Sequence, residues 1–117
     1  MGQTGKGQAP QAKLGADKPA ATSIICEAIG KRALLEFNYH GQRRVVAPYC
    51  HGISTRDVEV LRAIQVRGRS TSGGYGFGKL WTVAEMENLR LMDETFVPDD
   101  PKYNPTDTAM KKIYCRV

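Results

Sequence analysis

The chain has 117 residues, of which 41% are hydrophobic and 25% are charged, a composition typical of one folded globular domain rather than of a disordered chain. No stretch approaches the roughly 20 apolar residues that a membrane span requires, and the N-terminal segment has no apolar core that could serve as a secretory signal. We therefore expect a cytoplasmic protein with no membrane partner, and its formal net charge of +5 favours an anionic partner.

The first 22 residues are rich in Gly, Ala, Gln, Lys and Pro and contain one leucine. A segment of this composition buries too little apolar surface to offset the entropy of ordering it, so residues 1–22 are predicted to form a flexible tail. Thr22 and Ser23 are good N-cap residues, and the apolar residues that follow recur at helical spacing up to Ile29. The sequence therefore predicts one short α-helix over residues 23–31.

Five β-strands are expected after the helix. Residues 33–39 alternate apolar and polar side chains, and they are predicted to form a hairpin with a strand that begins at Arg43. A near-continuous apolar run at 58–67 predicts a central strand. Two further short strands are expected at 80–83 and 87–91, after a glycine-dense loop.

This order of elements predicts a mainly β fold, built as a small five-stranded barrel of the SH3 or Sm type. The barrel and the one short α-helix that precedes it would occupy residues 23–97, with the flexible tail at 1–22. Residues 98–117 contain three prolines and show no clear periodicity. We expect them to form a C-terminal extension that packs on the barrel, with residues 106–117 forming either a last helical turn or a strand.

Several segments, in this order, resemble the WYL family, whose barrel core is similar to Sm and SH3-like folds. The segments that carry the resemblance are the opening helix with Ala28-Ile29, LLEFNY ending at Tyr39, RRVVAPY with Pro48, VEVLRAIQ, and LWTVAEMENLRL followed by Phe96. The resemblance implies a regulatory module that senses an anionic ligand.

The chain departs from the family pattern at two places. The family's naming triplet falls at Glu59-Val60-Leu61, where only the leucine matches. The later strand, in which the family places arginines implicated in ligand sensing, carries Thr82 and Glu85 instead. The family's transcription regulators also place a helix-turn-helix before this domain, and none is predicted here. We therefore expect a stand-alone or accessory version of the sensing module.

Basic and aromatic side chains form two groups that predict binding of an anion. The glycine-rich loop at 68–78 and its flanks mix cations with aromatic rings, as proteins that bind single-stranded nucleic acid do. A second basic group lies on neighbouring strands, where an arginine in an apolar strand can clamp a phosphate. The predicted ligand-binding residues are Arg43, Arg44, Arg62, Arg67, Arg69, Tyr75 and Lys79.

These groups also have structural interpretations. Tyr75 and Phe77 could cover one end of the barrel, and Arg62 could pair with a carboxylate such as Glu36. A second functional hypothesis is a protein-interaction module that forms homo-oligomers, because an exposed strand edge can pair with another copy or with a partner peptide. The first hypothesis remains a sensing module for a nucleotide-like ligand or single-stranded nucleic acid.

No constellation typical of an enzyme accompanies these residues. Residues 73–79 almost match the phosphate-binding pattern G-x-x-x-x-G-K, but Leu80 replaces the Ser or Thr that holds magnesium, and a strand rather than a helix is predicted to follow. His40 and His51 lack the acid and nucleophile partners of a triad. We therefore expect no catalytic residues and no cofactor.

The cysteines are odd in number and far apart in the sequence, at positions 26, 50 and 115. This pattern favours reduced thiols over a disulfide framework. A zinc site requires a close pair of Cys or His ligands at the usual spacing, and the sequence has none. We therefore expect no metal.

Overall fold

The computed structural model describes residues 17–68 and 79–117. In chain order the elements are α1 (Asp17–Lys31), β2 (Ala33–Tyr39), β3 (Gln42–Ser54), β4 (Glu59–Gly68), β5 (Leu80–Thr82), the 3-10 helix η1 (Val83–Glu85), β6 (Met86–Thr95) and β7 (Met110–Arg116). The strand pairs within the two described ranges are all antiparallel. No helix in these ranges has the length and the apolar character that crossing a membrane requires.

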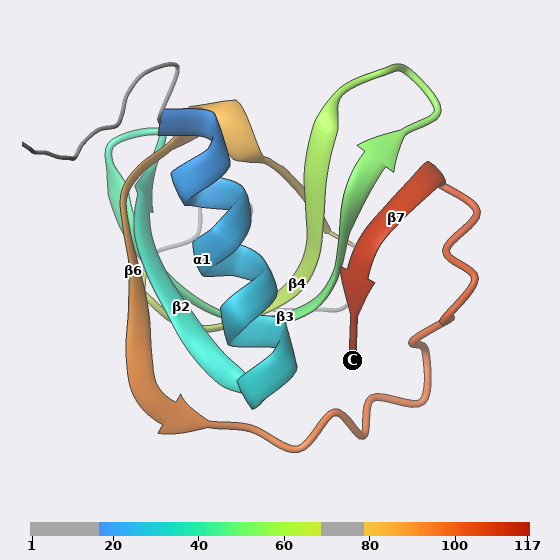
Figure 1. Cartoon of the computed structure of the whole chain (residues 1–117). Helices are drawn as coiled ribbons and strands as arrows, with labels where there is room; N and C mark the ends of the chain where they lie inside the picture. Colours follow the sequence, from blue (N-terminus) through green and yellow to red (C-terminus); the bar gives the residue numbers. More distant parts are fainter. Residues whose placement is uncertain (1–16, 69–78) are drawn as a thin grey trace, which may run out of the picture.

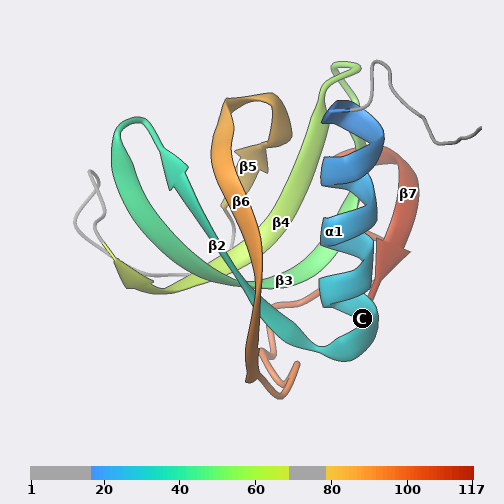
Figure 2. The same cartoon turned by 60° about the vertical axis from the view of Figure 1, so that its left-hand side comes forward.

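The six strands form one curved sheet, and α1 packs against one face of it (Figures 1 and 2). Hydrogen-bonded neighbours follow the order β5-β4-β3-β2-β6, and β7 pairs separately with β3. The long β3 can serve three partners because β2 pairs with its first half and β7 with its last five residues. Its pairing with β4 changes register on either side of Pro48, which cannot donate a ladder hydrogen bond.

The predicted mainly β fold with one preceding helix is confirmed, but the sheet differs from the predicted five-stranded barrel. It has six strands, and the end strands β5 and β6 do not pair with each other in the described residues, so the barrel is not closed. The additional strand is β7, which comes from the segment predicted as a C-terminal extension. Of the two alternatives for the end of that segment, a helical turn or a strand, the structure shows the strand, Met110–Arg116.

The first hairpin agrees with its prediction, whereas the start of the helix does not. The turn between β2 and β3 is His40-Gly41, with φ angles of 52° and 77°, and such paired left-handed residues match the twist of the strands that they join. The predicted hairpin is confirmed. The helix, in contrast, begins at Asp17 instead of residue 23, so residues 17–22 of the predicted flexible tail are helical. Pro19 is compatible with this start, because it lies in the first turn, where its missing N–H costs no helical hydrogen bond.

Apolar side chains cover both faces of the central strands. One cluster lies between α1 and the sheet, and a second lies against the chain that follows β6. As a result, β3 is buried along almost its whole length, unlike an antiparallel strand with one solvated face. The main members are Ile25, Ile29, Phe37, Leu61 and Trp81 in the first cluster, and Leu34, Val45, Tyr49, Phe96 and Tyr103 in the second.

A disulfide bond joins Cys26 in α1 to Cys115 in β7. The prediction that all three cysteines are reduced is therefore wrong for this pair, whereas Cys50 is free and buried. The sequence could not indicate the pairing, because the two partners are 89 residues apart and meet only when β7 pairs with β3. The bond fastens the helix to the last strand of the sheet.

Candidate anion-binding site

Arg43 and Arg44 are neighbours in the sequence but lie on opposite faces of β3, as alternation along a strand requires. Arg43 is exposed and donates a hydrogen bond from Nε to the Glu36 carboxylate. Arg44 stands opposite Phe37 in the β2–β3 register, on the face that the helix covers, and is only 2% exposed. The same dipeptide thus supplies one surface cation and one buried cation.

The Arg44 guanidinium lies beside two aromatic rings. Its central carbon is 5.9 Å from the Tyr39 ring centroid and 5.6 Å from that of Trp81. Nη2 donates to the Tyr39 carbonyl oxygen at 3.2 Å, and Nη1 donates to Gln65 Oε1 at 3.4 Å. Nε is buried and has no hydrogen-bond partner among the residues that the structure describes. Within residues 17–68 and 79–117, no carboxylate forms an ion pair with Arg44.

A second cation, Lys79, is exposed and lies near the same two rings. Its Nζ lies 4.7 Å from the Trp81 ring centroid and 6.0 Å from that of Tyr39. The rings are held by their own polar groups: Trp81 Nε1 donates to the Ala63 carbonyl at 3.2 Å, and Tyr39 Oη accepts from the backbone N–H of Thr82 at 3.0 Å. We call Tyr39, Arg44, Gln65, Lys79 and Trp81 the Arg44 site.

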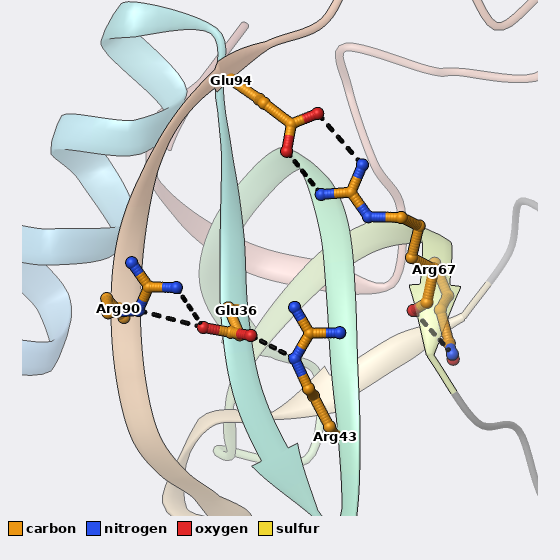
Figure 3. Close-up of polar contacts among 6 residues, drawn as sticks. Glu36, Arg43, Arg67, Arg90 and Glu94 are labelled. Atoms are coloured by element: carbon orange, nitrogen blue, oxygen red, sulfur yellow. Dashed lines mark hydrogen bonds and ion pairs between the residues drawn. The ribbon is translucent and has the colours of Figure 1, made fainter.

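Three of the predicted ligand-binding arginines, Arg43, Arg62 and Arg67, form ion pairs with carboxylates. Arg43 bonds to Glu36, which also accepts from Arg90, and Arg67 bonds to Glu94 (Figure 3). Hydrogen bonds from Arg90 and Arg43 hold the pKa of the Glu36 carboxyl below its ordinary value. These pairs engage Arg43 of β3, Arg67 of β4 and Arg90 of β6 on the surface of the sheet, and the group of two arginines around Glu36 keeps a formal charge of +1.

Arg62 forms the structural ion pair that was its alternative interpretation, but with a different partner. Its Nε and Nη2 donate to Asp107 at 2.7 and 3.0 Å, and both side chains are largely buried. The suggested partner, Glu36, is on another part of the sheet and is paired with other arginines. Asp107 lies between β6 and β7, so the ion pair fixes this connection to β4.

The ion pair between Arg62 and Asp107 makes stability depend on pH. The Arg62 guanidinium holds the pKa of the Asp107 carboxyl below its ordinary value, so its stabilising contribution is complete above about pH 4 and is lost as the pH falls through the folded-state pKa. Arg62→Met is expected to lower the free energy of unfolding by about 3 kcal/mol at pH 7, because it leaves a largely buried carboxylate unpaired.

Urea unfolding at neutral and acidic pH tests this expectation. The difference between wild type and Arg62→Met should shrink as the pH falls below about 4, where Asp107 becomes protonated. Arg67→Met serves as the control, because it removes an exposed ion pair with Glu94 and should have a much smaller effect. A difference that stays constant down to the lowest measurable pH would contradict the assignment of the pH dependence to this pair.

The structure brings together only part of the predicted site. Of the seven predicted residues, Arg44 and Lys79 meet at one pair of rings, whereas Arg69 and Tyr75 lie outside the described residues. Tyr39, Gln65 and Trp81 belong to the site but were not among the predicted ligand-binding residues. A usable signal existed for Trp81, since the only tryptophan of the chain follows Lys79 by two positions.

Comparison with known proteins does not identify a family for this chain. No protein-family model, curated protein or solved structure matches it.

Proposed function

We propose that the protein is a non-enzymatic sensing module of the WYL type that binds an anionic ligand at the Arg44 site. The observation that carries the proposal is the buried guanidinium of Arg44, which has no carboxylate partner in the described chain and an unpaired Nε. A buried charge costs several kcal/mol unless an opposite charge and hydrogen bonds compensate it. An anion bound beside Arg44 would supply both.

The chemistry of the site favours a phosphate or a similar oxyanion. A guanidinium presents its donors as a planar fork, and an oxyanion can accept from Nε and one Nη at the same time. The exposed Lys79 provides a second charge on the side from which a ligand would approach. A nucleotide-like ligand would place its phosphate against Arg44, with Lys79 as a second cation near the same two rings.

The aromatic rings of the site support the cations rather than a nucleobase. Trp81 is fully buried and Tyr39 is 5% exposed, so neither ring offers a free face on which a base could stack. Single-stranded nucleic acid therefore has less support at this site than a small phosphate ligand. The aromatic residue predicted to stack bases, Tyr75, lies outside the described residues.

A binding experiment with matched arginine variants tests the proposal. Labelled single-stranded DNA and RNA are titrated by fluorescence anisotropy, and nucleoside triphosphates by calorimetry, at about 50 and about 200 mM salt. Arg44→Met is expected to weaken nucleotide binding roughly 10- to 100-fold, which corresponds to the loss of charge-assisted hydrogen bonds. Arg43→Met, the neighbouring surface arginine, should leave it within about twofold.

The two ligand classes give different outcomes. Nucleotide binding that depends on Arg44, with little affinity for oligonucleotides, would establish the small-ligand form of the proposal. Oligonucleotide binding that falls steeply with salt would establish the nucleic-acid form if Arg44→Met abolishes it. If no anion binds, or if Arg44→Met binds as tightly as wild type, the proposal is wrong. Thermal unfolding of Arg44→Met checks that the variant is folded.

A second candidate function is assembly through an exposed strand edge. The ten-residue strand β6 ends the sheet, and only β2 pairs with it in the described chain. Its exposed charges at Glu87, Arg90 and Glu94 are typical of edges that avoid pairing with another chain. Light scattering tests this second candidate: a dimer or larger ring at all concentrations would support assembly, and a monomer would contradict it.

A further inference from the structure

A second cluster of reactive side chains lies where α1 contacts β7, separate from the Arg44 site. Cys26, His51 and Cys115 come from α1, β3 and β7, and their potential ligand atoms all lie within 4.8 Å of one another. His51 Nδ1 is 3.6 Å from Cys26 Sγ and 3.7 Å from Cys115 Sγ. Because the three residues are distant in the sequence, no spacing motif could reveal them.

The environment of His51 fixes which nitrogen faces the sulfur atoms. Its ring is fully buried, and Nε2 lies 2.7 Å from Glu59 Oε2, which also accepts a hydrogen bond from the Thr22 hydroxyl at 3.0 Å. With its proton on Nε2, the neutral imidazole presents the lone pair of Nδ1 to both sulfurs. A metal-binding histidine usually donates its other ring N–H to a carboxylate, which fixes the orientation of the imidazole.

We propose that the reduced protein binds a thiophilic divalent metal ion, Zn²⁺, through the two cysteine sulfurs and His51 Nδ1. Tetrahedral zinc with Zn–S near 2.3 Å and Zn–N near 2.1 Å has N···S edges of about 3.6 Å. The observed distances from Nδ1 to Cys26 Sγ and Cys115 Sγ, 3.6 and 3.7 Å, match these edges. Only the two sulfurs must separate, which breaking their bond allows.

The conversion from disulfide to metal site requires one external two-electron reductant. A dithiol or phosphine reductant supplies two electrons, and two protons complete the two thiols. Zn²⁺ then displaces the two thiol protons and binds both thiolates and the neutral imidazole. Since the same sulfur atoms form the disulfide and bind the metal, the two states exclude each other. Either state joins α1 to β7.

The site has three protein ligands in the described chain, so one tetrahedral position remains for water. Both cysteines are partly exposed, which gives solvent and the metal access to this position. The third cysteine, Cys50, is buried against Met110 Sδ at 3.6 Å and lies in a different cluster. It provides a natural control for non-specific thiol binding. This proposal does not depend on the proposed function.

Metal titration of the full chain tests the inference. Reduced, chelator-treated protein is titrated with Co²⁺, which gives a thiolate charge-transfer band when bound by cysteine, and Zn²⁺ is then added to displace it. We expect one metal ion per chain in wild type and in Cys50→Ser, at least 100-fold weaker binding in Cys26→Ser, and roughly 10-fold weaker binding in Glu59→Gln.

The oxidised protein, tested in parallel without reductant, should bind no metal at this site. The inference is overturned if reduced wild type binds no stoichiometric metal, or if Cys26→Ser binds as tightly as wild type. It is also overturned if Cys50→Ser is the variant that loses the charge-transfer band. The conservative Glu59→Gln variant retains an oxygen acceptor for His51, so it separates loss of metal affinity from loss of folding.

Discussion

Reduction of the disulfide between Cys26 and Cys115 is expected to lower the free energy of unfolding by about 4.5 kcal/mol. The bond closes a loop of 89 residues, and a cross-link of this span removes roughly that much conformational entropy from the unfolded chain. It also joins α1, which covers one face of the sheet, to the strand β7. This is a large fraction of the stability of a small domain.

Urea unfolding with and without reductant, in the presence of a metal chelator, measures this contribution. Cys50→Ser is the matched control, because it retains the bond and should lose the same amount on reduction. Adding Zn²⁺ in place of the chelator should restore part of the lost stability if the reduced cysteines bind metal. An unfolding midpoint that reductant leaves unchanged in wild type would show that the bond does not stabilise the native state.

Trp81→Ala is expected to lower the free energy of unfolding by about 4 kcal/mol, as truncation of a fully buried aromatic residue typically does. The indole has no exposed surface and contacts the rings of Phe37 and Tyr39 at centroid distances of 5.4 and 5.0 Å. Its removal leaves a cavity at the centre of the core and leaves the Ala63 carbonyl without its side-chain donor.

Denaturant unfolding of three variants isolates the core contribution. Trp81→Phe should cost about half as much as Trp81→Ala, because it keeps part of the ring volume but loses the hydrogen bond. Val97→Ala removes apolar atoms from a residue that is 73% exposed and should change stability by less than about 0.5 kcal/mol. If Trp81→Ala cost no more than Val97→Ala, Trp81 would not be a core residue.

Local patterns predicted the helix, the first hairpin and the mainly β character of the chain. The hairpin also determines which of the two adjacent arginines, Arg43 or Arg44, is buried. A two-residue turn at His40-Gly41 places Arg44 opposite Phe37, on the face of the strand where the apolar side chains alternate. With this two-residue turn, the register places Arg44, and not Arg43, on the apolar face of the strand.

Other features depend on contacts between distant segments, which sequence patterns do not encode. Arg62 pairs with Asp107, which is 45 residues later in the chain. Cys26 and Cys115 come together only when β7 pairs with β3. β7 follows a proline-rich segment, and nothing in its own sequence indicates that β3 is its partner. The sheet is also not closed into the predicted barrel, because its end strands β5 and β6 do not pair in the described residues.

The intrinsic fluorescence of Trp81 tests the central claim, binding of an anion beside Arg44, most directly. Trp81 is the only tryptophan, and its ring centroid lies 5.6 Å from the Arg44 guanidinium carbon and 4.7 Å from Lys79 Nζ. Titration with pyrophosphate, which does not absorb at the excitation wavelength, should change the emission saturably in wild type and Arg43→Met but not in Arg44→Met. A wild-type emission that pyrophosphate and nucleotides leave unchanged, or an equal change in Arg44→Met, would contradict it.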